Sequence, residues 1–296
     1  MSALFFYSLH QRILASDCEL RFLSPADPVA EPELTLALMT RAAPRSGTPW
    51  HRVAAADIEQ TAAGELVMRF GDGTHFLVGA DGRSIALIDA PAEYTVDDLA
   101  AYALGPVLTI ALHVQGAVLL HAAAVAMNGR AIVFAGNSGS GKSTTAAMLH
   151  LQGWTVLSDD ITEVSGGRAL PAIPAIRLWP DVLDVLYGSA AAFPDHAPSW
   201  DKKILVTPRA AGAHEIAAVL FLDRGGEPRF ERLPPREGWQ RLMACVPTAQ
   251  LPGKKMQRKI FETTSALADG VPMYTFTAPP LERAETLPSF LAEHLP

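Results

Sequence analysis

The chain has 296 residues, of which 49% are hydrophobic and 19% charged, and its formal net charge is −7. This length and apolar content exclude a disordered chain and suffice for about two domains with their own cores. The acidic balance argues against a duplex-DNA-binding protein, which would carry a basic surface, so we expect no nucleic-acid partner. The two cysteines, Cys18 and Cys245, are too few for a disulfide framework and favour a reducing, cytoplasmic compartment.

Residues 1–95 are expected to form a small β-rich domain. Short runs that contain β-branched and aromatic residues are separated by turns with Asp-Gly, which is typical of an antiparallel meander. The expected strands are residues 65–70, 74–79 and 84–89. The apolar spacing of residues 33–41 fits a short helix.

Residues 96–296 are expected to form an α/β domain, because strand-like and helix-like runs alternate after residue 100. Strands are predicted at 118–127, 131–135, 154–158, 161–164, 216–222 and 273–277, and helices at 95–104, 142–151, 181–187, 238–244, 254–267 and 281–294. The proline-punctuated segment 171–180 is expected to be a loop.

One apolar stretch needs a separate interpretation. No charged residue occurs between Asp98 and Arg130, and the stretch is long enough to span a bilayer. It contains Gly105-Pro106 and two histidines, however, and it runs into a turn. Buried elements of a soluble core explain it better, so we expect no membrane partner.

A glycine-rich motif follows one of the predicted strands and opens a predicted helix. Residues 136–143, GNSGSGKS, match the pattern G-x-x-x-x-G-K-[ST]. Such glycines let backbone amides curl around a phosphate at the positive end of the helix. Lys142 would reach the β- and γ-phosphates, and the Ser143 hydroxyl would bind Mg²⁺. The sequence therefore predicts a nucleotide site, with ATP as the expected nucleotide, made of Gly136, Asn137, Ser138, Gly139, Ser140, Gly141, Lys142, Ser143 and Thr144.

An acidic pair, Asp159-Asp160, ends the next predicted strand, 17 and 18 residues after Lys142. Motor ATPases normally place their Mg²⁺-binding Asp on a later strand, and the guanine-reading pattern N-K-x-D of GTPases is absent from the sequence. A carboxylate this close to the γ-phosphate can hold an acceptor hydroxyl and take its proton during in-line transfer. The spacing thus favours a kinase.

Three segments together resemble the catalytic domain of HPr kinase/phosphorylase over residues 118–162. They are the run 120–125 with His121, the glycine-rich motif, and the run 157–160. The resemblance implies an α/β, P-loop-containing, HPr kinase-like fold. It also implies that His121 is an active-site histidine, that Lys142 and Ser143 serve the phosphates and Mg²⁺, and that Asp160 accepts the proton. Phosphoenolpyruvate carboxykinase shares the pattern, but this chain is short and lacks a recognisable carboxylate-substrate constellation.

The chain also departs from that family. The Glu-x-Arg-Gly-type signature, which supplies a metal-binding glutamate and the phosphorylase function, is absent, and residues 173–181 stand in its place. We therefore expect no phosphorylase activity. A second Mg²⁺ ligand is expected at Asp159, with Asp181 as the alternative. The cation that stabilises the transferred phosphoryl group is left open among Arg177, Lys202, Lys203 and Arg209.

Short chains with this kinase half resemble the HPr kinase homologues of bacterial peptide-modification systems, which include lasso-peptide precursor kinases. The expected function is transfer of the ATP γ-phosphoryl group to a serine hydroxyl of a peptide or protein, with Asp160, His121 and Lys142 as catalytic residues. A small-metabolite kinase and a nucleotide-sensing module without phosphotransfer are the alternatives. The full-length enzymes of the family are oligomeric, so the resemblance leaves a homo-oligomer open.

Overall fold

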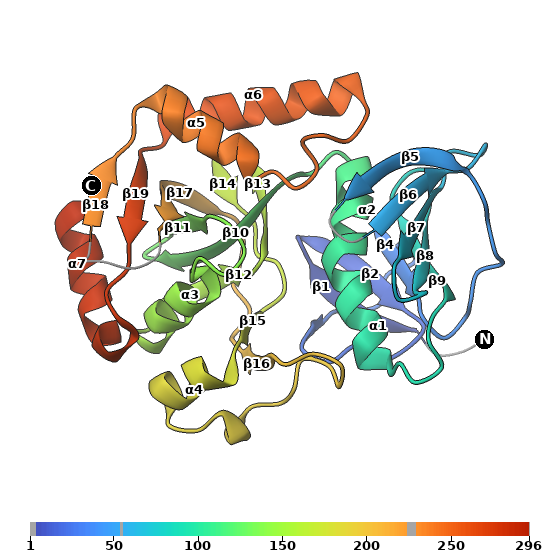
Figure 1. The fold of residues 1–296 in the computed structure, drawn as a ribbon, viewed down its shortest axis with the longest axis horizontal. Helices are drawn as coiled ribbons and strands as arrows, with labels where there is room; N and C mark the ends of the chain where they lie inside the picture. The colour runs from blue at the N-terminus through green and yellow to red at the C-terminus, as the bar shows by residue number, and fades with distance from the viewer. Residues whose placement is uncertain (1–3, 54–55, 224–228, 296) are drawn as a thin grey trace. The chain divides into compact units, whose positions relative to one another are not determined.

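The computed structural model describes residues 4–53, 56–223 and 229–295, which form a mixed α/β structure (Figure 1). The chain divides into two compact units. The first contains residues up to 117 together with 197–200 and 250–257, and the second contains 118–196, 201–249 and 258 onwards. The first boundary between the units therefore lies at 117/118, whereas the sequence predicted it at 95/96. The difference arises because the helices that follow residue 95 belong to the first unit.

The first unit is built on a β-sheet. Nine strands within the described residues lie in the order β3-β1-β2-β4-β9-β8-β7-β6-β5. Their bounds are β1 Phe5–Leu9, β2 Arg12–Ser16, β3 Ser24–Pro25, β4 Leu34–Ala37, β5 Thr48–Val53, β6 Ala56–Gln60, β7 Leu66–Phe70, β8 His75–Val78 and β9 Ser84–Asp89. The antiparallel meander β7–β8–β9 confirms the predicted strands.

The expected helix over residues 33–41 is wrong. Residues Leu34–Ala37 form β4, which pairs in parallel with β2 and β9. Leu34 and Leu36 are buried, while Thr35 between them is exposed. This alternation has the period of a strand, and the surrounding sheet selects it over the weak helical spacing.

The apolar stretch between Asp98 and Arg130, which contains no charged residue, divides among several elements. Helix α1, Val96–Tyr102, begins with a capping box between Thr95 and Asp98. A π-helical turn, Ala103–Val107, contains Pro106 and leads into α2, Leu108–Val114. The remainder enters strand β10, Val118–Met127. Within the described ranges, the chain has no helix with the length and apolar character that a membrane crossing requires.

The second unit contains a mixed sheet whose path is β11-β10-β13-β14-β17-β19-β18, with β12 paired to β10. Because β11 also pairs in parallel with β17, the strands β11, β10, β13, β14 and β17 form a closed ring of pairings. The strands are β11 Arg130–Ala135, β12 Thr155–Ser158, β13 Ile161–Ser165, β14 Arg168–Ala169, β17 His214–Leu222, β18 Arg229–Arg232 and β19 Met273–Thr277. The helices are α3 Lys142–Leu151, α4 Pro180–Tyr187, α5 Pro235–Ala244, α6 Lys254–Gly270 and α7 Leu287–His294.

Each strand and helix predicted after residue 117 has a counterpart, but residues 281–286 of the last predicted helix form a 3₁₀ segment, and β18 was not predicted. Segment 171–180 contains β15, Ala175–Leu178, which pairs with β16, Lys203–Val206, so the expected loop is wrong there. The prolines on either side of this short strand favoured a loop prediction, although its Ile176 and Leu178 are buried. Helix α3 packs against β10, β11 and β12 (Figure 1).

The core of this unit contains Phe134 and Phe276, both fully buried, with ring centroids 6.3 Å apart. At the turn between β10 and β11, Asn128 and Gly129 have φ values of 53° and 81°, as a two-residue hairpin requires.

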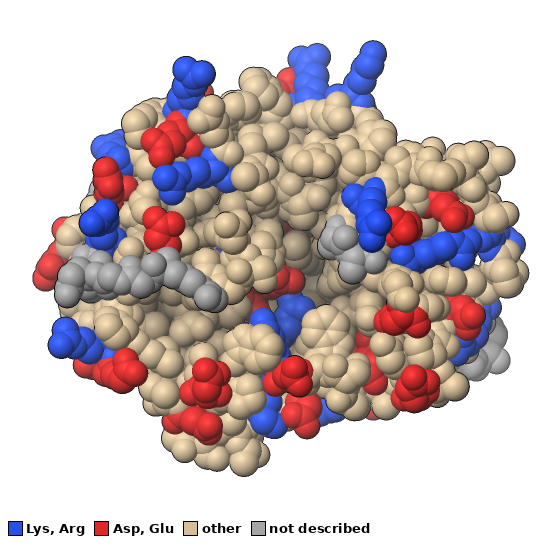
Figure 2. All heavy atoms as spheres, viewed as in Figure 1, with Lys and Arg blue, Asp and Glu red and all other residues tan. Residues whose placement is uncertain are grey.

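On the face of the protein drawn in Figure 2, basic and acidic side chains are interspersed.

Candidate active site

The glycine-rich loop, residues 136–141, connects β11 to α3, as the sequence predicted. Gly136, Gly139 and Gly141 have φ values of 144°, 76° and 102°, which residues with a Cβ rarely adopt. A Cβ on Gly136 would also lie 2.9 Å from Ser140 Oγ. The glycines therefore allow the backbone to curl back at the N-terminus of α3, where the first amide groups have no partner inside the helix.

Lys142, the first residue of α3, directs its ammonium group back across the loop. Its Nζ lies 2.9 Å from the carbonyl oxygen of Gly136, 3.0 Å from that of Asn137 and 3.1 Å from His121 Nε2. Burial lowers the pKa of Lys142, and the negative charge of Asp160 opposes this shift. All three ammonium hydrogens thus have an acceptor, so a phosphate oxygen bound here would replace one of these contacts.

His121 projects from β10 at the one partly exposed position between buried neighbours. Its Nδ1 lies 3.2 Å from Asp160 Oδ1. Because Nε2 accepts from the Lys142 ammonium, we assign the ring hydrogen to Nδ1, which then donates to Asp160. The backbone reinforces this placement, since the amide of Ala122 donates to the carbonyl oxygen of Asp160 at 3.0 Å.

Asp160 lies in the turn between β12 and β13 with a φ of 73°, a left-handed conformation that Asp tolerates better than most residues. Arg177 Nη2 lies 2.9 Å from its Oδ2. Burial would raise the pKa of Asp160, but the hydrogen bond from His121 and the positive charge of Arg177 outweigh burial and hold this pKa well below its usual range. The carboxylate is therefore ionised and can accept a hydrogen from a bound hydroxyl.

Asp159 is buried beside the first turn of α3, with a side chain only 2% exposed. Ser143 Oγ donates to its Oδ1 at 2.7 Å, and the backbone amide of Arg177 donates to its Oδ2 at 3.0 Å. Burial raises the pKa of Asp159, and the nearby charge of Arg177 opposes the shift. Asp181, the alternative ligand in the sequence analysis, is exposed on α4 instead.

The donor set of Ser143 and Asp159 fits Mg²⁺. A hydroxyl and a carboxylate oxygen are hard ligands, and Mg²⁺ usually takes one or two protein carboxylates and completes its shell with phosphates and water. Among the described residues, no group of three or more His, Cys, Asp or Glu side chains could hold a metal alone. The pair therefore suits a cation that arrives with a phosphate ligand better than a metal caged by protein.

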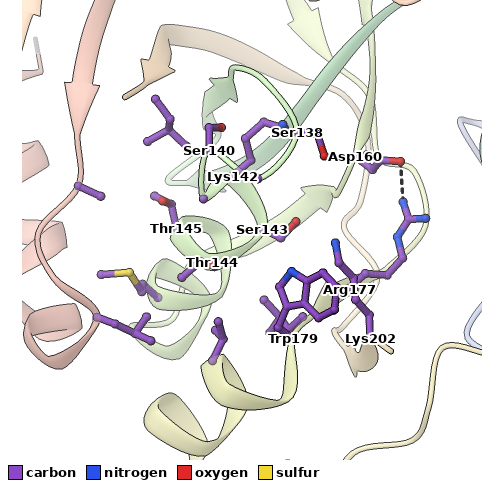
Figure 3. A pocket seen from close by; sticks show the side chains of 18 of the residues that line it. Ser138, Ser140, Lys142, Ser143, Thr144, Thr145, Asp160, Arg177, Trp179 and Lys202 are labelled. Carbon is purple, nitrogen blue, oxygen red and sulfur yellow. Dashed lines mark hydrogen bonds and ion pairs between the residues drawn. The ribbon is translucent and has the colours of Figure 1, made fainter. Parts of the chain in front are cut away.

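His121, Lys142, Ser143 and Asp160 line a cavity of about 410 Å³, a volume usual for small-ligand sites, and Asp159 lies buried behind Ser143 (Figure 3). Of the four cations that the sequence left open, Arg177 and Lys202 line it. Lys203 pairs with Asp195 instead, and Arg209 is not among the lining residues. The full lining is His121, residues 138–145, Met148, Asp160, residues 177–179, Val182, Lys202, Leu222, Asp223, Ala278, Pro279 and Leu281.

Trp179 is a lining residue that the sequence analysis missed. It directly follows β15 and precedes α4, and it is 50% exposed although it is large and apolar. Lys202 Nζ lies 5.4 Å from the centroid of its ring. No sequence signal separates this tryptophan from a core residue, because its exposure depends on the β15–β16 pairing.

Comparison with known proteins identifies one family. The family described as "ScmC: SynChlorMet cassette protein ScmC" matches residues 99–279, which is more than half of the chain, so the chain belongs to this family. No curated protein matches the chain.

Proposed function

We propose that this member of the ScmC family is an ATP-dependent kinase that transfers the γ-phosphoryl group to a serine hydroxyl of a peptide or protein. Its second unit would then be a P-loop catalytic domain of the HPr kinase type. The observation that carries the proposal is the continuous set of contacts from Lys142 through His121 and Asp160 to Arg177, beside the glycine-rich loop. The sequence resemblance favours a lasso-type precursor peptide as the acceptor.

In this proposal the loop binds the phosphates. Backbone amides of residues 139–143 and the Lys142 ammonium group hold the phosphate oxygens, as loop and helix N-terminus geometry allows. Ser143 and Asp159 would hold Mg²⁺, which would neutralise part of the phosphate charge when bound.

Asp160 accepts the hydrogen of the serine hydroxyl. The serine oxygen forms a bond to the γ-phosphorus, the bond from that phosphorus to the β–γ bridging oxygen breaks, and the serine proton passes to Asp160. With its low pKa this carboxylate is a weak base, which suits a loose transition state in which the proton leaves late. His121 and Arg177 fix the orientation of the carboxylate, and Arg177 also offsets charge on the transferred group.

The Asp160→Asn variant tests the proposal. Asn keeps the shape and tolerates the left-handed backbone, but its amide cannot take up the hydroxyl proton. We expect the variant to bind Mg-ATP within about threefold of the parent, while transfer falls by roughly a hundredfold or more. Asp181→Asn, at an exposed position on α4, is the matched control and should transfer normally.

Short serine-containing peptides encoded beside the gene are the first acceptors to incubate with Mg-ATP, and intact mass reports the gain of phosphate. Phosphorylated serine with the parent and Asp181→Asn, but not with Asp160→Asn, would support the proposal. Equal rates for parent and Asp160→Asn would refute Asp160 as the proton acceptor. Tight ATP binding without transfer to any peptide or small hydroxyl compound would favour the nucleotide-sensing alternative.

A further inference from the structure

Two consecutive lysines, Lys202 just before β16 and Lys203 at its first position, face different surroundings. Lys203 lies opposite Leu178, the last residue of β15, and Lys202 and Trp179 are the residues next to this pair. Lys203 Nζ lies 2.8 Å from Asp195 Oδ1 and accordingly forms an ion pair there. Lys202 instead lies against the Trp179 ring and lines the cavity (Figure 3). Of these two neighbouring lysines, Lys202 is therefore the one that reaches the site.

Lys202 is also the lining cation whose charged group has no hydrogen-bond acceptor and no ion-pair partner among the described residues. The Lys142 ammonium has three acceptors, and Arg177 is paired with Asp160. Over residues 4–53, 56–223 and 229–295, the Lys202 ammonium group pairs with no carboxylate, and its contact is with the Trp179 ring. The positive charge of Lys202 repels that of Lys142 and adds to the lowering of the Lys142 pKa. Two ammonium groups that repel each other across one cavity favour an anion between them.

We infer that Lys202 binds the terminal phosphate of a nucleoside triphosphate and thereby makes the site prefer a triphosphate to a diphosphate. This inference rests on the proposed function. The glycine-rich loop and Lys142 serve phosphates that both nucleotides possess. Lys202 approaches from the β15–β16 side, where Arg177 reaches Asp160 and where the transferred group must lie (Figure 3). When the triphosphate binds, the Lys202 ammonium leaves the Trp179 ring for the phosphate, and it returns when only the diphosphate is bound.

Calorimetric titration with Mg²⁺ and either a non-hydrolysable ATP analogue or ADP tests this inference. Loss of a charge-assisted contact predicts that Lys202→Gln weakens triphosphate binding roughly tenfold or more and diphosphate binding by less than about threefold. Lys202→Arg should retain most of the preference. Lys203→Gln, which changes the neighbouring lysine, is the matched control and should alter neither affinity.

Fluorescence gives a second readout. Departure of the cation from the indole ring should change the emission of Trp179 when the triphosphate analogue binds, but not when ADP binds. Trp179→Phe should remove this signal. Lys202→Gln should remove it as well, although the tryptophan is still present.

Three results would overturn the inference. If Lys202→Gln weakens the binding of both nucleotides equally, this lysine contacts a phosphate that both nucleotides possess. Unchanged affinities with slower transfer would assign it to the acceptor. If the parent protein binds neither nucleotide, the proposed function itself fails, and that result is visible before any variant is measured.

Discussion

Replacing His113 with leucine should make the first unit less sensitive to acid. His113 lies in α2 with a residue exposure of 5%, and its Nδ1 has no hydrogen-bond partner among the described residues. Burial lowers the pKa of His113 from 6.5 to about 4. Between these two values the unfolded chain binds more protons than the folded chain, so the free energy of unfolding falls as the pH falls.

The size of this effect follows from the two pKa values. At pH 5 an unfolded histidine is almost fully protonated, while folded His113 is mostly neutral. Linkage then gives a loss of about 2 kcal/mol relative to pH 7, and the loss stops growing once the pH is below the folded value. In the His113→Leu variant this part of the pH dependence should be absent.

Urea unfolding of the full chain at pH 7 and pH 5 measures the difference. Hydrogen exchange of peptides from β7–β9 reports the free energy of unfolding of the first unit specifically. The parent should lose about 2 kcal/mol more than His113→Leu on acidification. His51→Leu, at a partly exposed position on β5, is the control and should behave as the parent does. Equal losses for parent and His113→Leu would refute the argument, because they would show that His113 is protonated equally in both states.

Three further changes test the packing around the site. Ser143→Ala removes the hydroxyl that donates to buried Asp159 and should lower the free energy of unfolding by about 2 kcal/mol in urea titrations; an unchanged value would mean that water replaces the hydroxyl fully. At the left-handed position of Asp160, Asp160→Gly should melt at a higher temperature than Asp160→Ala, because alanine there costs about 1 kcal/mol or more. The reverse order in calorimetry would contradict the assigned backbone conformation. Phe276→Ala opens a cavity in a fully buried position and should cost about 3–5 kcal/mol, measured by urea unfolding; a cost below about 1 kcal/mol would show that the core closes over the gap.

The elements around the candidate site could be predicted because their local signals are strong. Strands β10 and β11 are apolar runs joined by Asn128-Gly129, and α3 begins directly after the glycine-rich loop. Lys142 and the Asp159-Asp160 pair could be singled out by motif and spacing, and His121 by the family resemblance. The structure brings these residues together, and their roles stay predictions.

Other features depend on contacts between distant segments, which leave no local pattern. The apolar residues of segment 33–41 fit a short helix as well as a strand, and only the pairing with β2 and β9 selects the strand. Residues 197–200 belong to the first unit through contacts such as the hydrogen bond from the Ser199 amide to Asp98 Oδ1, at 3.0 Å and about 100 residues away in sequence. The position of Lys202 beside Trp179 likewise follows from strand pairing rather than from composition.

The pairing of β10 with both β12 and β13 has a consequence for how this protein can change over evolution. His121 lies on β10, and Asp160 lies in the short turn between β12 and β13, which both pair with β10, so hydrogen-bonded strands on either side fix their separation. Insertions in the segment between α4 and β16 would leave that separation untouched, whereas deletion of one residue within β10 would turn the histidine to the opposite face of the sheet. If the protein is the kinase we propose, recognition of new acceptors can therefore diversify in the connecting segments while His121 and Asp160 keep their alignment.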